Sequence, residues 1–222
     1  MKALGLVDLG WTYMNLDDCW AADARDPTTG DLVPNAKTFP DGIKVVTDAL
    51  HAAGMRFGIY TDRGTKTCGG KPGSQGHEVQ DSKLFASWGV DYVKSDSCAT
   101  NRGSVAQEVA QFGLMRDALN ATGRAVLFSL CSVYIENSTL GNMWRIGQDI
   151  NGWGNVMNAL NCNAALGDRA EPGGWNGLSA CPSACPSACP SDLVQIQPPG
   201  SARSPIASAA VQFRRSQRRR SR

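Results

Sequence analysis

Strand-like and helix-like segments alternate along most of this chain, and this alternation restricts its fold more than any other feature. Apolar runs with strand character lie at residues 13–16, 56–60, 90–94 and 125–130. Segments with a helical spacing of apolar residues lie at 41–53, 77–88 and 103–121. Gly54, Gly89 and Gly123 follow these segments, as expected just past a helix end. Because strands that alternate with helices form βαβ units, the pattern predicts an α/β protein with a parallel sheet.

Charged side chains stand at the carboxyl ends of three predicted strands. They are, in chain order, Asp17, Asp18, Asp62, Lys94 and Asp96. In a (β/α)8 barrel, the carboxyl ends of the strands form the face that carries the active site. A single aspartate in this place can simply cap the next helix. A whole set of carboxylates at one edge would lose solvation and repel each other, so the pattern indicates a functional site.

The character of the sequence changes after Trp175. The tetrapeptide Ala-Cys-Pro-Ser occurs three times between Ala180 and Ser191, and Pro, Ser, Gly and Arg dominate from there on. Such a composition offers little apolar surface to bury. We therefore expect a folded part at residues 1–177 and a low-complexity, disordered tail at 178–222. We expect no metal site in the repeat, because no histidine accompanies its cysteines.

The net charge of +2 conceals an uneven distribution. Seven of the 22 lysines and arginines lie in residues 200–222, which leaves 15 basic against 20 acidic residues in 1–199. An acidic folded part argues against a nucleic acid or a membrane surface as its partner. The arginine-rich end keeps nucleic-acid association open as an alternative. No apolar run is long enough to span a membrane, and no signal peptide is visible.

Several motifs occur in the order, and with the approximate gaps, of a known family. They are YMNLDDCW (13–20), FPDGI (39–43), GIYTD (58–62), KTCGGKPGS (66–74) and FASWGVDYVKSDSC (85–98). Together they resemble glycoside hydrolase family 27, the α-galactosidases (melibiases) and α-N-acetylgalactosaminidases. The resemblance implies a (β/α)8 TIM barrel. We expect this chain to hold an incomplete one, in which the first strand and the last strands are missing.

The resemblance also implies a reaction and its catalytic residues. Enzymes that hydrolyse glycosides commonly place two carboxyl groups on either side of the scissile bond. Asp96 matches the nucleophile, and Asp149, in WRIGQD (144–149), matches the acid/base. The implied reaction removes terminal α-D-galactosyl residues by double displacement, with retention, through a covalent glycosyl-enzyme. It uses no metal and no cofactor.

Five further residues are implied to bind the sugar. Asp17 and Asp18 match acceptors for the C6 and C4 hydroxyls, Lys94 holds hydroxyls beside the nucleophile, and Arg145 binds near C2. Ser132 stands where α-galactosidases of the family place a glutamate, and a small residue there resembles the α-N-acetylgalactosaminidase branch. We expect an α-galactosidase, with α-N-acetylgalactosaminidase as the alternative. An inactive galactose-binding remnant or gene fragment is the alternative of another class.

The cysteines and the setting follow from the same resemblance. Cys68 and Cys98 match a family disulfide beside the active face, whereas two buried thiols are the alternative. The family partner of Cys19 lies upstream of residue 1, so we expect Cys19 to be unpaired. The expected partner is an α-galactoside oligosaccharide or glycolipid, without nucleic acid or membrane insertion, and the oligomeric state stays open. The implied location is secreted or lysosomal/vacuolar.

Overall fold

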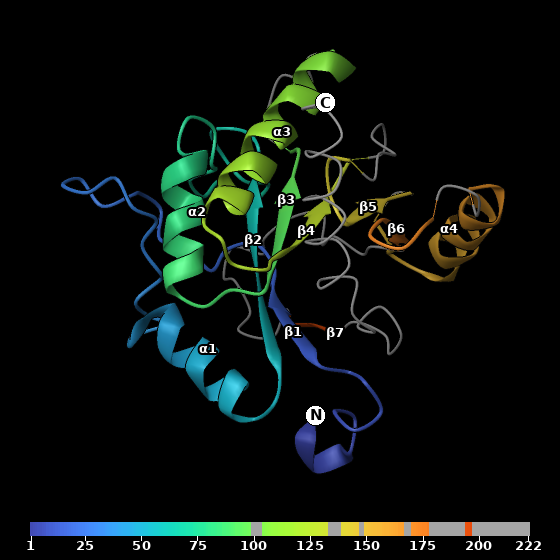
Figure 1. Cartoon of the computed structure of the whole chain (residues 1–222), viewed down its shortest axis with the longest axis horizontal. Helices are drawn as coiled ribbons and strands as arrows, with labels where there is room; N and C mark the ends of the chain where they lie inside the picture. The colour runs from blue at the N-terminus through green and yellow to red at the C-terminus, as the bar shows by residue number, and fades with distance from the viewer. Residues whose placement is uncertain (99–103, 133–138, 147–148, 167–169, 178–193, 197–222) are drawn as a thin grey trace, which may run out of the picture.

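The computed structural model describes residues 1–98, 104–132, 139–146, 149–166, 170–177 and 194–196. After the 3-10 turn η1 (Lys2–Leu4), strands and helices alternate (Figure 1). The strands are β1 (Tyr13–Leu16), β2 (Arg56–Asp62), β3 (Tyr92–Asp96), β4 (Leu127–Leu130), β5 (Met143–Arg145), β6 (Trp175–Gly177) and β7 (Val194–Ile196). The helices are α1 (Gly42–Ala52), α2 (Glu78–Ser87), α3 (Val105–Ala121) and α4 (Trp153–Ala165).

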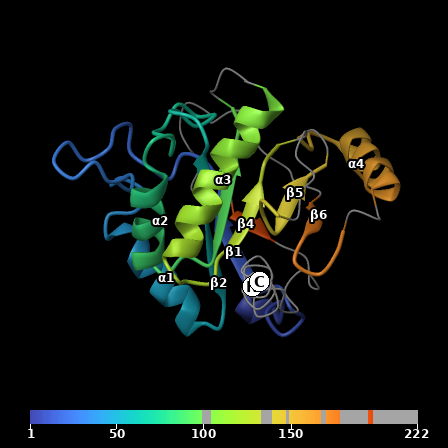
Figure 2. The same ribbon diagram turned by 45° about the horizontal axis from the view of Figure 1, so that its top comes forward.

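The described strands form one sheet, in the order β6-β5-β4-β3-β2-β1-β7. Strands β1 to β6 are parallel and each pairs with the next in sequence. This regular progression is that of a (β/α)8 barrel wall, in which each helical connection leads to the neighbouring strand. Helices α1, α2 and α3 lie together on one side of the sheet, and α4 lies beside β6 (Figure 2). The prediction of an α/β protein with a parallel sheet is confirmed.

The predicted elements agree with the observed ones to within two or three residues. Strand β3, for example, begins at Tyr92, two residues after its expected start at Val90. The two residues before Tyr92 make other backbone hydrogen bonds. The Val90 N–H donates to Phe85 O at the end of α2, and the Asp91 N–H donates to Phe57 O. No element was predicted at β5, β6 or α4; the two strands have only three residues each, too few to show a periodicity.

Part of the predicted tail belongs to the described structure. β7 pairs antiparallel with β1, with Met14 opposite Ile196. Residues 178–193 and 197–222 lie outside the described residues. In the described part of the chain, none of the helices has the length and apolar character needed to cross a bilayer.

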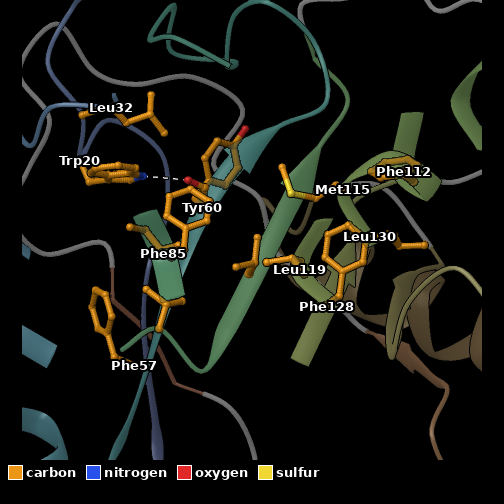
Figure 3. Close-up of a cluster of buried hydrophobic side chains, with 14 of the residues drawn as sticks. Trp20, Leu32, Phe57, Tyr60, Phe85, Phe112, Met115, Leu119, Phe128 and Leu130 are labelled. Atoms are coloured by element: carbon orange, nitrogen blue, oxygen red, sulfur yellow. Dashed lines mark hydrogen bonds between the residues drawn. The ribbon is translucent and has the colours of Figure 1, made fainter. Parts of the chain in front are cut away.

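The core lies between the sheet and helices α2 and α3 (Figure 3). Aromatic side chains from strand and helix meet there, among them Phe57, Phe85, Phe112 and Phe128, each no more than 3% exposed. Trp20, just after β1, packs edge-to-face against Phe85 and donates from Nε1 to Tyr60 O at 2.8 Å. This hydrogen bond holds the segment after β1 against β2, and so keeps the carboxyl ends of the two strands next to each other.

The other face of the strands carries the polar groups that matter for function. The register sets Asn15 beside Gly58 and Gly58 beside Tyr92. A Cβ on Gly58 would lie 2.0 Å from Asn15 Oδ1 and 2.7 Å from Tyr92 Cδ1, so only glycine fits between them. Because side chains on one face recur every second residue, Tyr60 and Asp62 follow Gly58 on this face. Lys94 and Asp96 are their register partners on β3.

Candidate active site

A buried ion pair joins the carboxyl ends of β1 and β3. Lys94 Nζ lies 2.8 Å from Asp17 Oδ2, and the two side chains are 3% and 4% exposed. The same Nζ lies 4.9 Å from the centroid of the Tyr60 ring. The positive charge is thus held between a carboxylate and an aromatic face, two surroundings that stabilise a cation away from water.

Asp96, at the end of β3, is 4% exposed and has both carboxylate oxygens engaged. Its Oδ1 accepts the Ser97 N–H at 2.8 Å, and its Oδ2 accepts the Tyr60 hydroxyl at 3.0 Å. Burial, and after it the charge of Asp96, raise the pKa of Tyr60 far above its ordinary value. The tyrosine therefore stays protonated, and its O–H remains a donor to Asp96.

Asp62 ends β2 beside Asp96 and is fully buried. Its Oδ1 accepts the Gly64 N–H at 2.7 Å, and its Oδ2 accepts the Cys98 N–H at 2.8 Å. Burial is the main cause that raises the pKa of Asp62 to about 6, and the charge of Asp96 acts in the same direction. Asp62 therefore holds together the loops that follow β2 and β3.

Asp18 lies at the same edge and is tied to the loop after β2. Its Oδ2 accepts the Gly69 N–H at 2.7 Å, and its Oδ1 accepts the Cys19 N–H at 2.6 Å. Burial raises the pKa of Asp18 despite these bonds. Since Asp17 Oδ1 accepts the Asp18 N–H at 2.8 Å, the two aspartates form one compact turn after β1.

Cys68 and Cys98 form a disulfide beside this group of carboxylates, with 4.9 Å between their Cα atoms, which confirms the predicted pair. The Tyr60 hydroxyl lies 3.0 Å from Cys68 Sγ. Cys19 is also disulfide-bonded, so the expectation of an unpaired thiol was wrong. That expectation considered only a partner upstream of residue 1.

The two disulfide sulfurs also bear on metal binding. The oxygens of Asp62 and Asp96 and the sulfurs of Cys68 and Cys98 lie within 4.8 Å of one another. Metal ligation by cysteine needs a thiolate, and these sulfurs are bonded to each other. In its disulfide form this cluster therefore lacks the thiolate ligands of a transition-metal site.

A second polar group forms at the carboxyl ends of β4 and β5. Arg145 Nη2 lies 2.7 Å from Asp149 Oδ1, with the side chains 11% and 21% exposed. Arg145 Nη1 also donates to Cys131 Sγ at 3.3 Å. Ser132, next to Cys131, is 5% exposed. Because β3, β4 and β5 are parallel neighbours, this group belongs to the same edge of the sheet as Lys94 and Asp96.

The structure therefore gathers every predicted site residue at one edge of the sheet. Neither Tyr60 nor Asp62 was predicted to be a site residue, although Asp62 stands at the end of a predicted strand. A usable signal was present for both, because they alternate with Gly58 and so share its face. No periodicity marks Arg63, Ser97 or Glu108, which contact one another next to Asp96.

Comparison with known proteins identifies relatives of this chain. The family model described as alpha galactosidase A matches residues 1–178. Alpha-galactosidase 3 of Arabidopsis thaliana is 46% identical over 178 residues, which are 78% of this chain and 40% of that protein. The α-galactosidase of Oryza sativa subsp. japonica is 45% identical over 179 residues, 78% of this chain and 42% of that protein.

Solved structures give the same result. The α-galactosidase of Saccharomyces cerevisiae superposes with a TM-score of 0.74 at 36% identity, covering 80% of this chain and 45% of the other. A structure of the S. cerevisiae α-galactosidase with raffinose gives a TM-score of 0.71 at 35% identity, with the same coverage. The chain thus spans less than half the length of these relatives. With most of its own length matched, it belongs to the alpha galactosidase A family, glycoside hydrolase family 27.

Proposed function

We propose that this chain carries the active site of a retaining exo-glycosidase that hydrolyses terminal α-D-galactosyl residues. The observation that carries the proposal is the buried set Asp17, Lys94, Tyr60 and Asp96 at the carboxyl edge of the sheet. Hydrogen bonds from the Tyr60 hydroxyl and the Ser97 N–H hold the two oxygens of the Asp96 carboxylate in a fixed orientation. A glycosidase nucleophile requires a carboxylate oriented in this way towards the anomeric carbon.

The proposed reaction has two steps. In the first, an Asp96 oxygen bonds to the anomeric carbon while the bond to the glycosidic oxygen breaks, and Asp149 gives its proton to that oxygen. In the second, a water attacks the anomeric carbon and gives a proton to Asp149. The ester bond to Asp96 breaks, so both carboxyl groups return to their starting states and galactose leaves.

Selection of galactose is assigned to the turn after β1. Asp17 and Asp18 are the proposed acceptors for the sugar's C6 and C4 hydroxyls. An equatorial C4 hydroxyl, as in glucose, would leave a partly buried carboxylate without its partner, and such a loss discriminates strongly between substrates. Asp18 suits this role because its backbone bonds to Gly69 and Cys19 hold it in one orientation.

One observation favours a second substrate. Ser132 is small, buried and next to Cys131, which contacts Arg145, the residue proposed to bind near C2. A small side chain there would leave room for an acetamido group, as α-N-acetylgalactosaminidase activity requires. The third candidate is a galactose-binding remnant without turnover, in which Asp17, Asp18 and Lys94 would bind the sugar.

The test compares hydrolysis of p-nitrophenyl α-D-galactoside with that of p-nitrophenyl N-acetyl-α-D-galactosaminide. Asp96→Asn is expected to abolish turnover, whereas Asp41→Asn, at an exposed helix cap without a side-chain bond, serves as the matched control. The galactose released first should be the α-anomer by NMR. Appearance of the β-anomer would contradict retention, and galactose binding by calorimetry without turnover would favour the remnant.

We also propose a secreted or lysosomal/vacuolar location. The Cys68–Cys98 disulfide supports it, because structural disulfides persist in oxidising compartments. Fractionation of expressing cells with alkylation of free thiols tests this proposal. Recovery of the protein in the cytosol with Cys68 alkylated would exclude it.

A further inference from the structure

A polar cluster built around a buried ion pair lies next to Asp96 and joins the ends of β2 and β3 to the first turns of α3. Ser97 Oγ accepts from Arg63 Nε at 2.6 Å and donates to Glu108 Oε1 at 3.1 Å. Arg63 Nε lies 3.7 Å from Glu108 Oε1, and Arg63 also donates to Gln111 Oε1. Arg63 and Glu108 are each 4% exposed, so the ion pair is shielded from water.

Two backbone N–H groups connect this cluster to Asp96, one to its carboxylate and one to its backbone carbonyl. The Ser97 N–H donates to Asp96 Oδ1 at 2.8 Å, and the Arg63 N–H donates to Asp96 O at 2.9 Å. The residue whose hydroxyl is held by the ion pair is therefore the residue whose amide orients Asp96. The other carboxylate oxygen is held separately, by Tyr60. A shift of Ser97 would rotate the carboxylate about its bond to Tyr60.

Stability alone is a poor explanation for the cluster. Two charges taken out of water lose solvation energy, and apolar residues of similar volume often replace a buried ion pair without loss of stability. Arg63 Nη2 has no hydrogen-bond partner among the described residues, so part of this cost is not offset there. Stacking of the guanidinium 5.9 Å from the Phe112 ring centroid offsets some of it. The hydrogen bonds from Arg63 and to Glu108 do, however, hold the Ser97 side chain in one orientation.

We propose that Ser97 and Glu108 are positioning residues for Asp96. Glu108, clamped by Arg63, holds the Ser97 side chain, and the Ser97 amide then holds the Asp96 carboxylate at the angle needed to attack the anomeric carbon. This inference rests on the proposed role of Asp96 as nucleophile. Reactions at a bound substrate depend steeply on such alignment, and a misplacement of about 1 Å can cost on the order of 100-fold in rate.

The experiment uses the full chain and four variants. Glu108→Ala and Ser97→Ala each remove the hydrogen bond between the Ser97 hydroxyl and the Glu108 carboxylate. Glu108→Gln keeps an oxygen that accepts from the Ser97 hydroxyl. Asp117→Ala removes an exposed acid from the same helix, 65% exposed, as the matched control. Ser97→Ala deletes a single hydroxyl and serves if Glu108→Ala does not fold.

Two readouts are taken on each protein. The first is hydrogen exchange of the amide at position 97, which requires no activity. The second is the rate at which 5-fluoro-α-D-galactosyl fluoride labels Asp96. In that reaction the Asp96 oxygen bonds to the anomeric carbon and fluoride leaves with the bonding electrons, so the acid/base residue contributes little.

Glu108→Ala and Ser97→Ala are expected to exchange faster at position 97 and to slow labelling by roughly 10- to 100-fold, with reagent affinity unchanged. Glu108→Gln is expected to restore both readouts to near the wild-type values. Equal exchange and equal labelling in Glu108→Ala and Asp117→Ala would overturn the inference. If the wild type is not labelled, the proposed function fails, and faster exchange in Glu108→Ala would still support the hold of the cluster on Ser97.

Discussion

At the scale of single residues, the site depends on charges that are buried together. Lys94 lies between Asp17 and the face of Tyr60, and Tyr60 in turn donates to Asp96. Each of these groups is at most 5% exposed, so none can exchange its protein partner for water without a structural change. Removal of one of these side chains therefore affects the others. The changes in unfolding free energy caused by single substitutions should not add up in the double variants.

Replacement of Lys94 by methionine tests this coupling. Lys94→Met removes the cation that faces the buried Asp17 carboxylate, and loss of one partner of a buried ion pair costs about 3–5 kcal/mol of unfolding free energy. The double variant Lys94→Met with Asp17→Asn should regain much of that stability, because it also removes the second charge. Urea denaturation of the three proteins measures the difference. Equal stability of Lys94→Met and the wild type would show that the pair is not coupled.

The stability of the folded protein is expected to depend on pH through Asp62. Its pKa is raised in the folded state to about 6, above the ordinary value of 3.8, so the folded protein binds the proton more tightly than the unfolded chain. The stabilisation from the protonated form is complete below pH 4 and is lost as pH rises to about 6. A shift of this size corresponds to roughly 2–3 kcal/mol.

Asp62→Asn serves as the control for this pH dependence. Asparagine does not titrate, so its unfolding free energy should lack the decline between pH 4 and pH 6 that Asp62 contributes. The variant should also be less stable at low pH, because its amide nitrogen cannot accept the N–H of Cys98 or Gly64. Denaturation at a series of pH values gives the unfolding free energy of the wild type and of Asp62→Asn. If the two proteins show the same change with pH, Asp62 is not the source of the pH dependence.

At the scale of elements, each strand and helix is positioned by a small number of contacts. Ser104 and Gln107 form a reciprocal capping box that starts α3, and this sets where Glu108 enters the cluster next to Asp96. β1, β2 and β3 are held in register on their polar face by the close approach of Asn15, Gly58 and Tyr92. That register sets the levels of Tyr60 and Lys94, and so the geometry of the site.

Gly58→Ala should disturb the register. Its Cβ would overlap Asn15 Oδ1 at 2.0 Å, and overpacking of a filled interior costs about 1–3 kcal/mol or more. Gly113→Ala is the matched control, because the nearest atom to its Cβ is Arg116 Nη2 at 3.8 Å. That change lies within α3 and should stabilise the protein by roughly 0.5–1 kcal/mol. Thermal unfolding measures both, and equal stability of the two variants would contradict the tight contact.

At the scale of the whole molecule, the described sheet is six parallel strands with β6 at one edge and β7 beside β1 at the other. Helices α1, α2 and α3 cover one face of the sheet, and the loops at its carboxyl edge carry the site residues. The Cys68–Cys98 disulfide links two of these loops across 30 residues of sequence, which include β3 and α2. It joins the loop that holds Asp18 to the segment that follows Asp96.

Removal of this disulfide should loosen the carboxyl edge. The chain-entropy estimate for a closed loop of this length is about 3–4 kcal/mol of unfolding free energy. The double variant Cys68→Ser with Cys98→Ser should lose stability of that order. Cys162→Ser, which alters a free and only partly buried thiol, should change it little. Guanidinium denaturation provides the comparison, and equal midpoints for the two proteins would show that the disulfide does not stabilise the fold.

The sequence by itself determined the order and type of most elements, because periodicity and glycine stops are local properties that each segment carries alone. It also placed the aspartates and Lys94 at strand ends, and strand ends of a parallel sheet share one edge by topology. The family motifs identified Asp96, Asp149 and the Cys68–Cys98 pair, and the roles of the two aspartates stay predictions. Strands of three residues, β5 and β6, were beyond reach, since they are too short to show a period.

Only the tertiary structure decided which of these groups touch. The hydrogen bond from Tyr60 to Asp96 spans 36 residues and the Lys94–Asp17 pair spans 77, so both depend on the register between separate strands. The contacts among Arg63, Ser97 and Glu108 depend in addition on how α3 packs on the sheet. Distances of about 3 Å between distant segments arise from packing of the whole core, and no local pattern in the chain encodes them.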